Sequence, residues 1–192
     1  MMKKLIPFLF LLFFLGCDRG PIIEDFKIEG VGLGDSLLDI MTKDEILEEI
    51  SNPQVSYETY SPPNLFYEFF TSNNLETYYE MSFYVYADDE KYIIQSINGF
   101  LKNSTLDGCY AEQDKISLEF KEMFTEAEYY EPEIYDHAII DGISIRESSF
   151  LMPEGEILVL QCWDVRNEDY MYDRQLTISI DTPELFIWLA QG

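Results

Sequence analysis

The sequence predicts an α+β fold: one curved antiparallel sheet with one long helix and short N- and C-terminal helices, in a single domain over residues 26–192. Residues 106–124 carry apolar side chains at three- and four-residue spacing, which is typical of a helix packed on a core. Segments 78–101 and 147–180 alternate apolar and polar side chains in short runs, which is typical of strands. These runs lack the intervening helices that a parallel sheet requires, so we expect antiparallel neighbours.

The first part of the domain is expected to contain a strand and a helix. Residues 26–29 alternate and predict a short strand, and the glycine-rich run 30–34 follows it. From Ser36 onward the pattern is helical. Thr42 and Glu45 have the spacing of a capping box, in which each side chain bonds to the other residue's backbone N–H. Asn52-Pro53 is expected to end this helix.

The middle of the chain predicts strands. Segment 55–70 is rich in Tyr and Phe, and Pro62-Pro63 divides it into two short strands. Segments 78–87 and 92–101 alternate on either side of the polar residues 88–90, which predicts a hairpin. The aromatic residues of 57–84, with Trp163 and Trp188, are expected to be core and cross-strand pairs, the alternative being a ligand groove.

The long helix is expected to begin after Ser104 or Thr105, either of which can cap it. We expect its core-facing stripe to contain Leu106, Cys109, Tyr110, Ile116, Phe120, Met123 and Phe124. Residues 126–136 are acidic and contain tyrosines, and we expect a loop there.

The C-terminal part is expected to be mainly strands. Segments 147–152 and 156–165 flank Pro153-Glu154-Gly155, which predicts a second hairpin. Residues 176–180 alternate and predict the last strand. Thr182-Pro183-Glu184 then has the form of a helix start, with a cap, a proline at the first position and an acid in the first turn.

The charge of the chain is strongly negative, since 12 Lys and Arg oppose 37 Asp and Glu, giving −25 at pH 7. Without residues 1–16, 10 basic residues remain and the net charge is −27. Such a surface repels nucleic acid and anionic lipid headgroups. It would attract cations and basic proteins or peptides, but we favour the reading in which it serves only solubility or a salty medium, because charge runs usually face solvent.

The N-terminus has the form of an export signal. Residues 1–17 read MMKKLIPFLFLLFFLGC, a basic start and an apolar run that is too short to span a membrane. The ending Phe14-Leu15-Gly16-Cys17 resembles the lipobox of bacterial lipoproteins. That resemblance implies cleavage after residue 16 and lipidation of the Cys17 thiol. The alternative is an ordinary signal peptide with an incidental cysteine.

A lipid anchor at Cys17 implies a protein held on the bilayer, with residues 17–25 as a short tether. We therefore expect a location in the bacterial cell envelope, facing the periplasm. Asp18 resembles the enteric signal for retention at the inner membrane, so that membrane is favoured.

Cys109 and Cys162 form an even pair in an exported chain, and a disulfide between them is the expected state. It would close a loop of about 50 residues, which stabilises by roughly 4 kcal/mol in the chain-entropy model. The alternative is two separate buried thiols.

Gly34-Asp35-Ser36-Leu37 resembles the signature of the GDSL esterases and lipases. In that family the serine is the nucleophile, just after the first strand of a parallel α/β sheet. A histidine near the C-terminus is the base, with an aspartate three residues before it. The resemblance implies Ser36 as nucleophile and His137, the one histidine in the chain, as base.

The surroundings of His137 depart from that family. Ile134 stands three residues before it, the adjacent acid is Asp136, and about 55 residues follow it. We therefore favour the reading in which Asp35 or Ser36 caps a short helix after the glycine run.

No metal or cofactor is expected, because one histidine and an expected disulfide pair do not supply a zinc site. The acidic groups at 88–90, 131–136 and 167–173 lack the spacing of an EF-hand loop. The mature region resembles small uncharacterised α+β envelope proteins of Gram-negative bacteria, through residues 34–46 and the two cysteine segments. The sequence thus favours a non-catalytic lipoprotein that binds or scaffolds, with a Ser36 hydrolase as the alternative.

Overall fold

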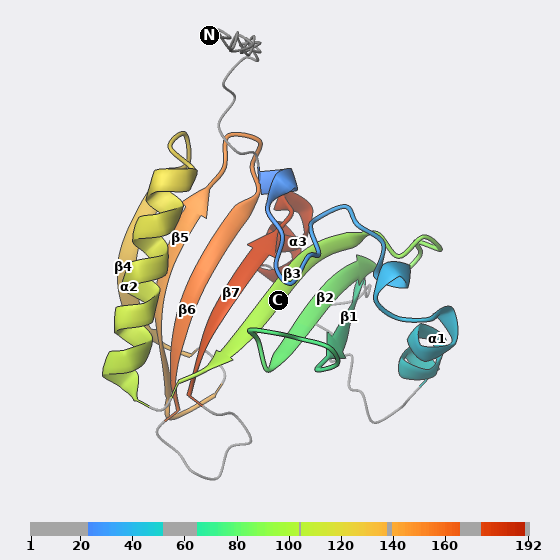
Figure 1. Cartoon of the computed structure of the whole chain (residues 1–192), viewed down its shortest axis with the longest axis horizontal. Coiled ribbons are helices and arrows are strands. Elements are labelled where there is room, and N and C mark those ends of the chain that lie inside the picture. Colours follow the sequence, from blue (N-terminus) through green and yellow to red (C-terminus); the bar gives the residue numbers. More distant parts are fainter. Residues whose placement is uncertain (1–22, 52–64, 104, 138–139, 166–173, 191–192) are drawn as a thin grey trace, which may run out of the picture.

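Seven antiparallel strands form one open sheet in the computed structural model, which describes residues 23–51, 65–103, 105–137, 140–165 and 174–190 (Figure 1). The order across the sheet is β1-β2-β3-β7-β6-β5-β4. The strands are β1 (Phe66–Thr71), β2 (Glu80–Tyr86), β3 (Ile94–Lys102), β4 (Glu128–Asp136), β5 (Ile143–Leu151), β6 (Ile157–Val165) and β7 (Gln175–Asp181). The predicted α+β class is confirmed.

The sheet consists of two meanders, each built from strands consecutive in the chain. We call β1–β3 the N-terminal meander and β4–β7 the C-terminal meander; they join where β3 pairs with β7. One row of core side chains crosses both, because paired residues point to the same face of a sheet. It contains Phe69, Phe83, Ile97, Ile180, Leu158 and Phe150, each fully or almost fully buried.

The core face of the sheet is covered by the long helix α2 (Leu106–Met123) and by the segment from η1 (Ile23–Asp25) to η2 (Leu37–Asp39) (Figure 1). Thr105 caps α2, its side chain accepting a hydrogen bond from the N–H of Gly108. Phe26 lies edge-on to Phe120 of α2, with ring centroids 5.4 Å apart. The N-terminal segment therefore packs against the helix as well as the sheet.

Two short helices complete the fold. α1 (Lys43–Ser51) stands beside β1 and buries Ile46, and its predicted capping box is confirmed by hydrogen bonds between Thr42 and Glu45 in both directions. α3 (Pro183–Leu189) begins with Pro183 at its first turn, as predicted. Its Trp188 ring lies 5.2 Å from that of Phe66, which strand alternation places on the face opposite Phe69.

Two predicted elements are wrong. Residues 26–29 are not a strand: Ile28 and Val31 pair across a tight turn whose central residues, Glu29 and Gly30, have φ of 51° and 82°. A two-residue turn with positive φ at both central positions folds the chain back before a strand can form. Segment 126–136 is not a loop, since it contains β4 at the edge of the sheet. Pairing with β5 stabilises this strand, while its acidic side chains remain exposed at the edge.

The buried face of α2 also differs from the predicted stripe. Gln113 and Ser117 are buried on it, whereas Met123 is exposed. Both predicted hairpins are present: β2 pairs with β3, and β5 with β6 around a turn in which Gly155 has a φ of 105°. The predicted signal and Cys17, the strand before residue 65 and the acidic group at 167–173 lie outside the described residues.

Candidate functional site

Ser36 acts as a helix cap. Its backbone bridges Ile93, just before β3, and its Oγ donates to the carbonyl of Lys91 at 2.7 Å. The same oxygen accepts from the N–H of Leu38 at the start of η2, 3.3 Å away. The Ser36 hydroxyl is thus engaged by two backbone groups that tie η2 to the β2–β3 turn.

His137 lies at the other side of the sheet, directly after β4. Its Nδ1 accepts from the N–H of Ile140 at 3.1 Å, and its ring centroid is 5.5 Å from that of Trp163. Four strand spacings separate β4 from β3, where Ser36 is attached, or about 19 Å. The structure therefore does not bring Ser36 and His137 together, and the sheet is antiparallel, unlike the sheet that the GDSL resemblance implies.

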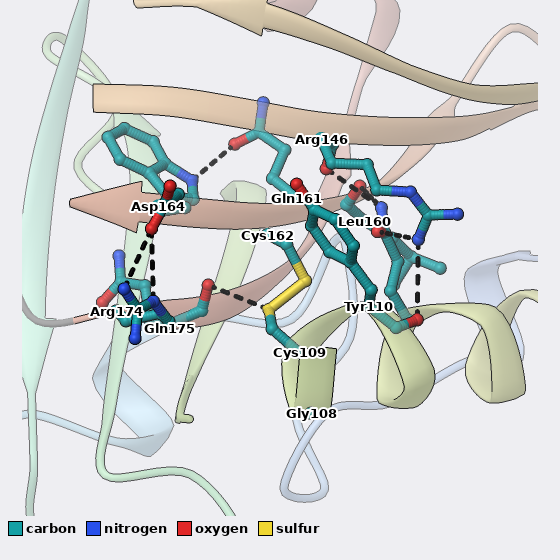
Figure 2. Close-up of a disulfide and its surroundings, with 12 residues drawn as sticks. Gly108, Cys109, Tyr110, Arg146, Leu160, Gln161, Cys162, Asp164, Arg174 and Gln175 are labelled. Carbon is teal, nitrogen blue, oxygen red and sulfur yellow. Dashed lines mark hydrogen bonds and ion pairs between the residues drawn. A yellow bond between two sulfur atoms is a disulfide. The ribbon is translucent and has the colours of Figure 1, made fainter. Parts of the chain in front are cut away.

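Cys109 and Cys162 form a disulfide in the structure, with Cα atoms 5.9 Å apart and both residues fully buried (Figure 2). The bond joins the first turn of α2 to the middle of β6, where Leu176 of β7 packs against it. It links positions 53 residues apart and fixes the start of the helix on the C-terminal meander.

A polar network centred on the buried Gln113 continues this attachment along α2. Gln113 Nε2 donates to the carbonyls of Leu160, at 2.8 Å, and Arg146, at 3.1 Å. Its Oε1 accepts from Arg146 Nη1 at 2.8 Å, and the other end of that guanidinium pairs with Asp114 at 2.7 Å. Figure 2 shows Arg146 beside Tyr110, whose ring centroid is 4.8 Å from Cζ. This arrangement is structural, because its polar atoms satisfy one another.

A cleft of about 1010 Å³ lies beside the N-terminal meander, and we call it the acidic cleft. Its walls come from α1, from the segment around η2, from the turn at Glu29 and from the β1–β2 connection. Among the described residues, its carboxylates are Glu29, Asp35, Asp39, Glu45, Glu48 and Glu49, and Lys27 is the one basic residue of the lining. Its apolar lining residues include Val31, Ile40, Met41, Leu75, Met81 and Phe83.

Glu29 holds two walls of the acidic cleft together. Its carboxylate accepts from the backbone N–H groups of Thr77, at 2.7 Å, Glu76, at 3.1 Å, and Tyr78, at 3.4 Å. These bonds, the one from Thr77 foremost, lower the pKa of Glu29. The charged form of Glu29 thus clamps the tight turn onto the β1–β2 connection.

Two further carboxylates of the lining are also engaged. Asp35 pairs with Lys27 at 2.9 Å and accepts from the N–H of Gly32, and these contacts lower its pKa, with the Lys27 bond foremost. Glu45 is occupied by Thr42 in the capping box, which lowers the pKa of Glu45.

The remaining three carboxylates of the lining belong to Asp39, Glu48 and Glu49. Their side chains have no hydrogen bond or ion pair with any described residue. Partial burial, and then the nearby charge of Glu45, raise the pKa of Glu49. The acidic cleft therefore combines unneutralised negative charge with apolar surface, which suits a cationic ligand with an apolar part.

The carboxylates do not converge on a single point. Among the residues that the structure describes, no group of three or more His, Cys, Asp or Glu is placed to hold a metal ion. Within the same residues, no helix has the length and hydropathy needed to cross a membrane.

Comparisons with protein-family models, with curated proteins and with solved structures find no match for this chain. The fold and the acidic cleft therefore define the molecule at the level of an acidic α+β domain.

Sequence reasoning did not find the acidic cleft. Its carboxylates come from three separate segments, and only the fold brings Glu29, Asp39 and Glu48 around one space. The signal available was the excess of acid on residues 44–49, which by itself is typical of a solvated helix face.

Proposed function

We propose that this protein is a non-catalytic lipoprotein of the bacterial cell envelope that binds a basic protein or peptide in its acidic cleft. The lipid on Cys17 holds the domain on the membrane, facing the periplasm, and Asp18 favours the inner membrane. Nucleic acid is not a partner, because the net charge of −27 that remains without residues 1–16 repels it.

One observation carries the binding proposal: the acidic cleft presents Asp39, Glu48 and Glu49 with no compensating cation among the described residues. Like charges gathered around a concave surface raise the local concentration of oppositely charged partners. The cleft differs in this respect from the polar surface beneath α2, where Arg146 is already matched by Asp114.

The anchor proposal rests on the lipobox resemblance at residues 14–17 and on the position of the first core residue. Ile23 is 4% exposed and lies only six positions after Cys17. A fully extended chain of that length reaches about 20 Å, so the domain would stay close to the bilayer.

Binding in the cleft is tested by titrating the full chain, in a neutral detergent, with a nonapeptide of alternating lysine and glycine that has leucine at its centre. The double variant Glu48→Gln with Glu49→Gln should weaken binding about fivefold, since each exposed ion pair contributes about 0.2–1 kcal/mol. The matched control is Asp44→Asn with Glu122→Gln, which removes the same charge from exposed positions outside the cleft lining. Equal weakening by both double variants would show that net charge, and not the cleft, attracts the peptide.

The anchor is tested separately by Cys17→Ser in cells supplied with labelled palmitate. The variant should lose the label and either leave the membrane fraction or keep its signal uncut. Unchanged labelling and fractionation would overturn the anchor without affecting the binding proposal. Density fractionation of the wild type distinguishes the inner from the outer membrane.

A further inference from the structure

The walls of the acidic cleft are chemically unequal. α1 presents Glu45, Glu48 and Glu49, whose spacing of three and four residues places them on one face of the helix. The β1–β2 connection contributes the uncharged groups of Asn73 and Asn74. A ligand that touches both walls needs positive charge toward α1 and neutral hydrogen-bonding groups toward the connection.

The floor of the cleft contains apolar side chains. Met81 and Phe83 of β2 close it from the core face of the sheet but are only 1% exposed, so the apolar surface open to a ligand comes from half-buried side chains such as Leu75 and Val31. A single metal ion or a uniformly charged polyamine would leave this surface against water. An apolar side chain that covers it gains the free energy of removing apolar area from water.

We infer, building on the proposed function, that the ligand is an extended basic segment of a partner protein, with one apolar side chain against Leu75 and Val31 and flanking lysine or arginine side chains paired with Glu48 and Glu49. The cleft volume of about 1010 Å³ matches the upper end of ligand pockets, about 300–1,000 Å³, and holds more than one side chain. An extended chain points successive side chains to opposite sides, so one residue reaches the floor while its backbone meets Asn73 and Asn74. A cation beside Glu49 would also offset the burial and the Glu45 charge that raise the pKa of Glu49.

The test compares three nonapeptides on the full chain by titration calorimetry at low salt. The first alternates lysine and glycine around a central leucine, the second has glycine at the centre, and the third replaces every lysine of the first by glutamate. We expect the leucine peptide to bind about tenfold more tightly than the glycine peptide, as burial of one leucine predicts. The glutamate peptide should not bind.

Variants of the lining then locate the effect. Leu75→Gln should abolish most of the leucine preference, while Leu75→Met should keep it. If the leucine peptide, the glycine peptide and spermidine bind equally well, the inferred ligand is wrong, although cation binding in the cleft still stands. If no lysine peptide binds, the proposed function itself is wrong.

Discussion

Each meander has a helix beside it, but α2 is fixed to the C-terminal meander, whereas a cleft separates α1 from the N-terminal meander. α2 is joined to the C-terminal meander by a disulfide, by the bonds of Gln113 and by a contact between Ser117 and Ser148. α1 stands beside the N-terminal meander with Ile46 as its one fully buried residue, and the acidic cleft lies between them. The difference shows how one chain provides both a closed scaffold and an open surface.

The contrast arises from which polar groups face the sheet. On α2 they are an amide and a hydroxyl, which can bond to strand carbonyls and leave no net charge buried. On α1 the polar groups line the acidic cleft instead and are Glu45, Glu48 and Glu49, and carboxylates resist burial without a cation. A helix with such a face does not close onto a sheet, so it leaves a space that a cationic ligand can occupy.

The largest expected effect on this difference comes from removing the disulfide that holds α2 on the C-terminal meander. Cys109→Ser, Cys162→Ser and the double variant should each lose about 2–5 kcal/mol of unfolding free energy, and by similar amounts, because each removes the same bond. Chemical denaturation without reductant measures this. The wild type in reductant is the control and should match the variants; two titratable thiols in the unreduced, unfolded wild type would contradict the bridge.

The second prediction concerns the polar attachment of α2. Gln113→Leu should cost about 2–3 kcal/mol, because the carbonyl of Leu160 and the guanidinium of Arg146 lose buried partners. Glu112→Gln, at the exposed neighbouring position, should change stability by less than about 0.5 kcal/mol. A cost for Gln113→Leu as small as that of the control would show that α2 is held by the disulfide and apolar packing alone.

The third prediction tests the seam between the meanders, where Asp181 of β7 pairs with Ser96 of β3. Burial raises the pKa of Asp181 to about 6. The unfolded value is about 3.9, so the folded state holds the proton more tightly and stability falls as pH rises from about 4 to 6. Asp181→Asn should therefore be more stable than the wild type by about 1–3 kcal/mol at pH 8.

That gain should disappear near pH 4, where Asp181 is protonated in the folded wild type. Denaturation at several pH values measures the difference, with Glu154→Gln in the exposed β5–β6 turn as the control for net charge. A gain that is constant with pH would show that the carboxylate at the seam is not the cause.

The sequence predicted the features that depend on neighbouring residues, and it did not predict those that depend on contacts between distant segments. The capping box at Thr42, the Thr105 cap and the Gly155 turn follow from neighbouring residues, and the structure contains all three. β4 was missed because its acidic composition is that of a loop, and only pairing with β5 makes it a strand. Gln113 was missed because hydrophobic periodicity ignores a buried amide whose partners lie 33 and 47 positions away.

The smallest predicted effect concerns the acidic cleft and the Glu29 carboxylate that joins two of its walls. Glu29→Gln should weaken the three backbone hydrogen bonds that join the tight turn to the β1–β2 connection, because charged acceptors bind N–H groups more strongly than neutral ones. Since Glu29 lies near the surface, we expect a loss of only about 1 kcal/mol. Hydrogen exchange should show it as faster exchange of the Thr77 amide, with the amide of Leu160 unchanged.

Because the pKa of Glu29 is lowered on folding, the contribution of its carboxylate to stability is present above the unfolded pKa of about 4.3 and is lost as pH falls through the folded value. The Thr77 amide of the wild type should thus lose protection in acid, whereas Glu29→Gln should show little such dependence and Glu76→Gln should behave as wild type. Faster exchange at Leu160 as well would mean that the two meanders open as one unit, and the distinction between the closed scaffold and the open cleft would fail.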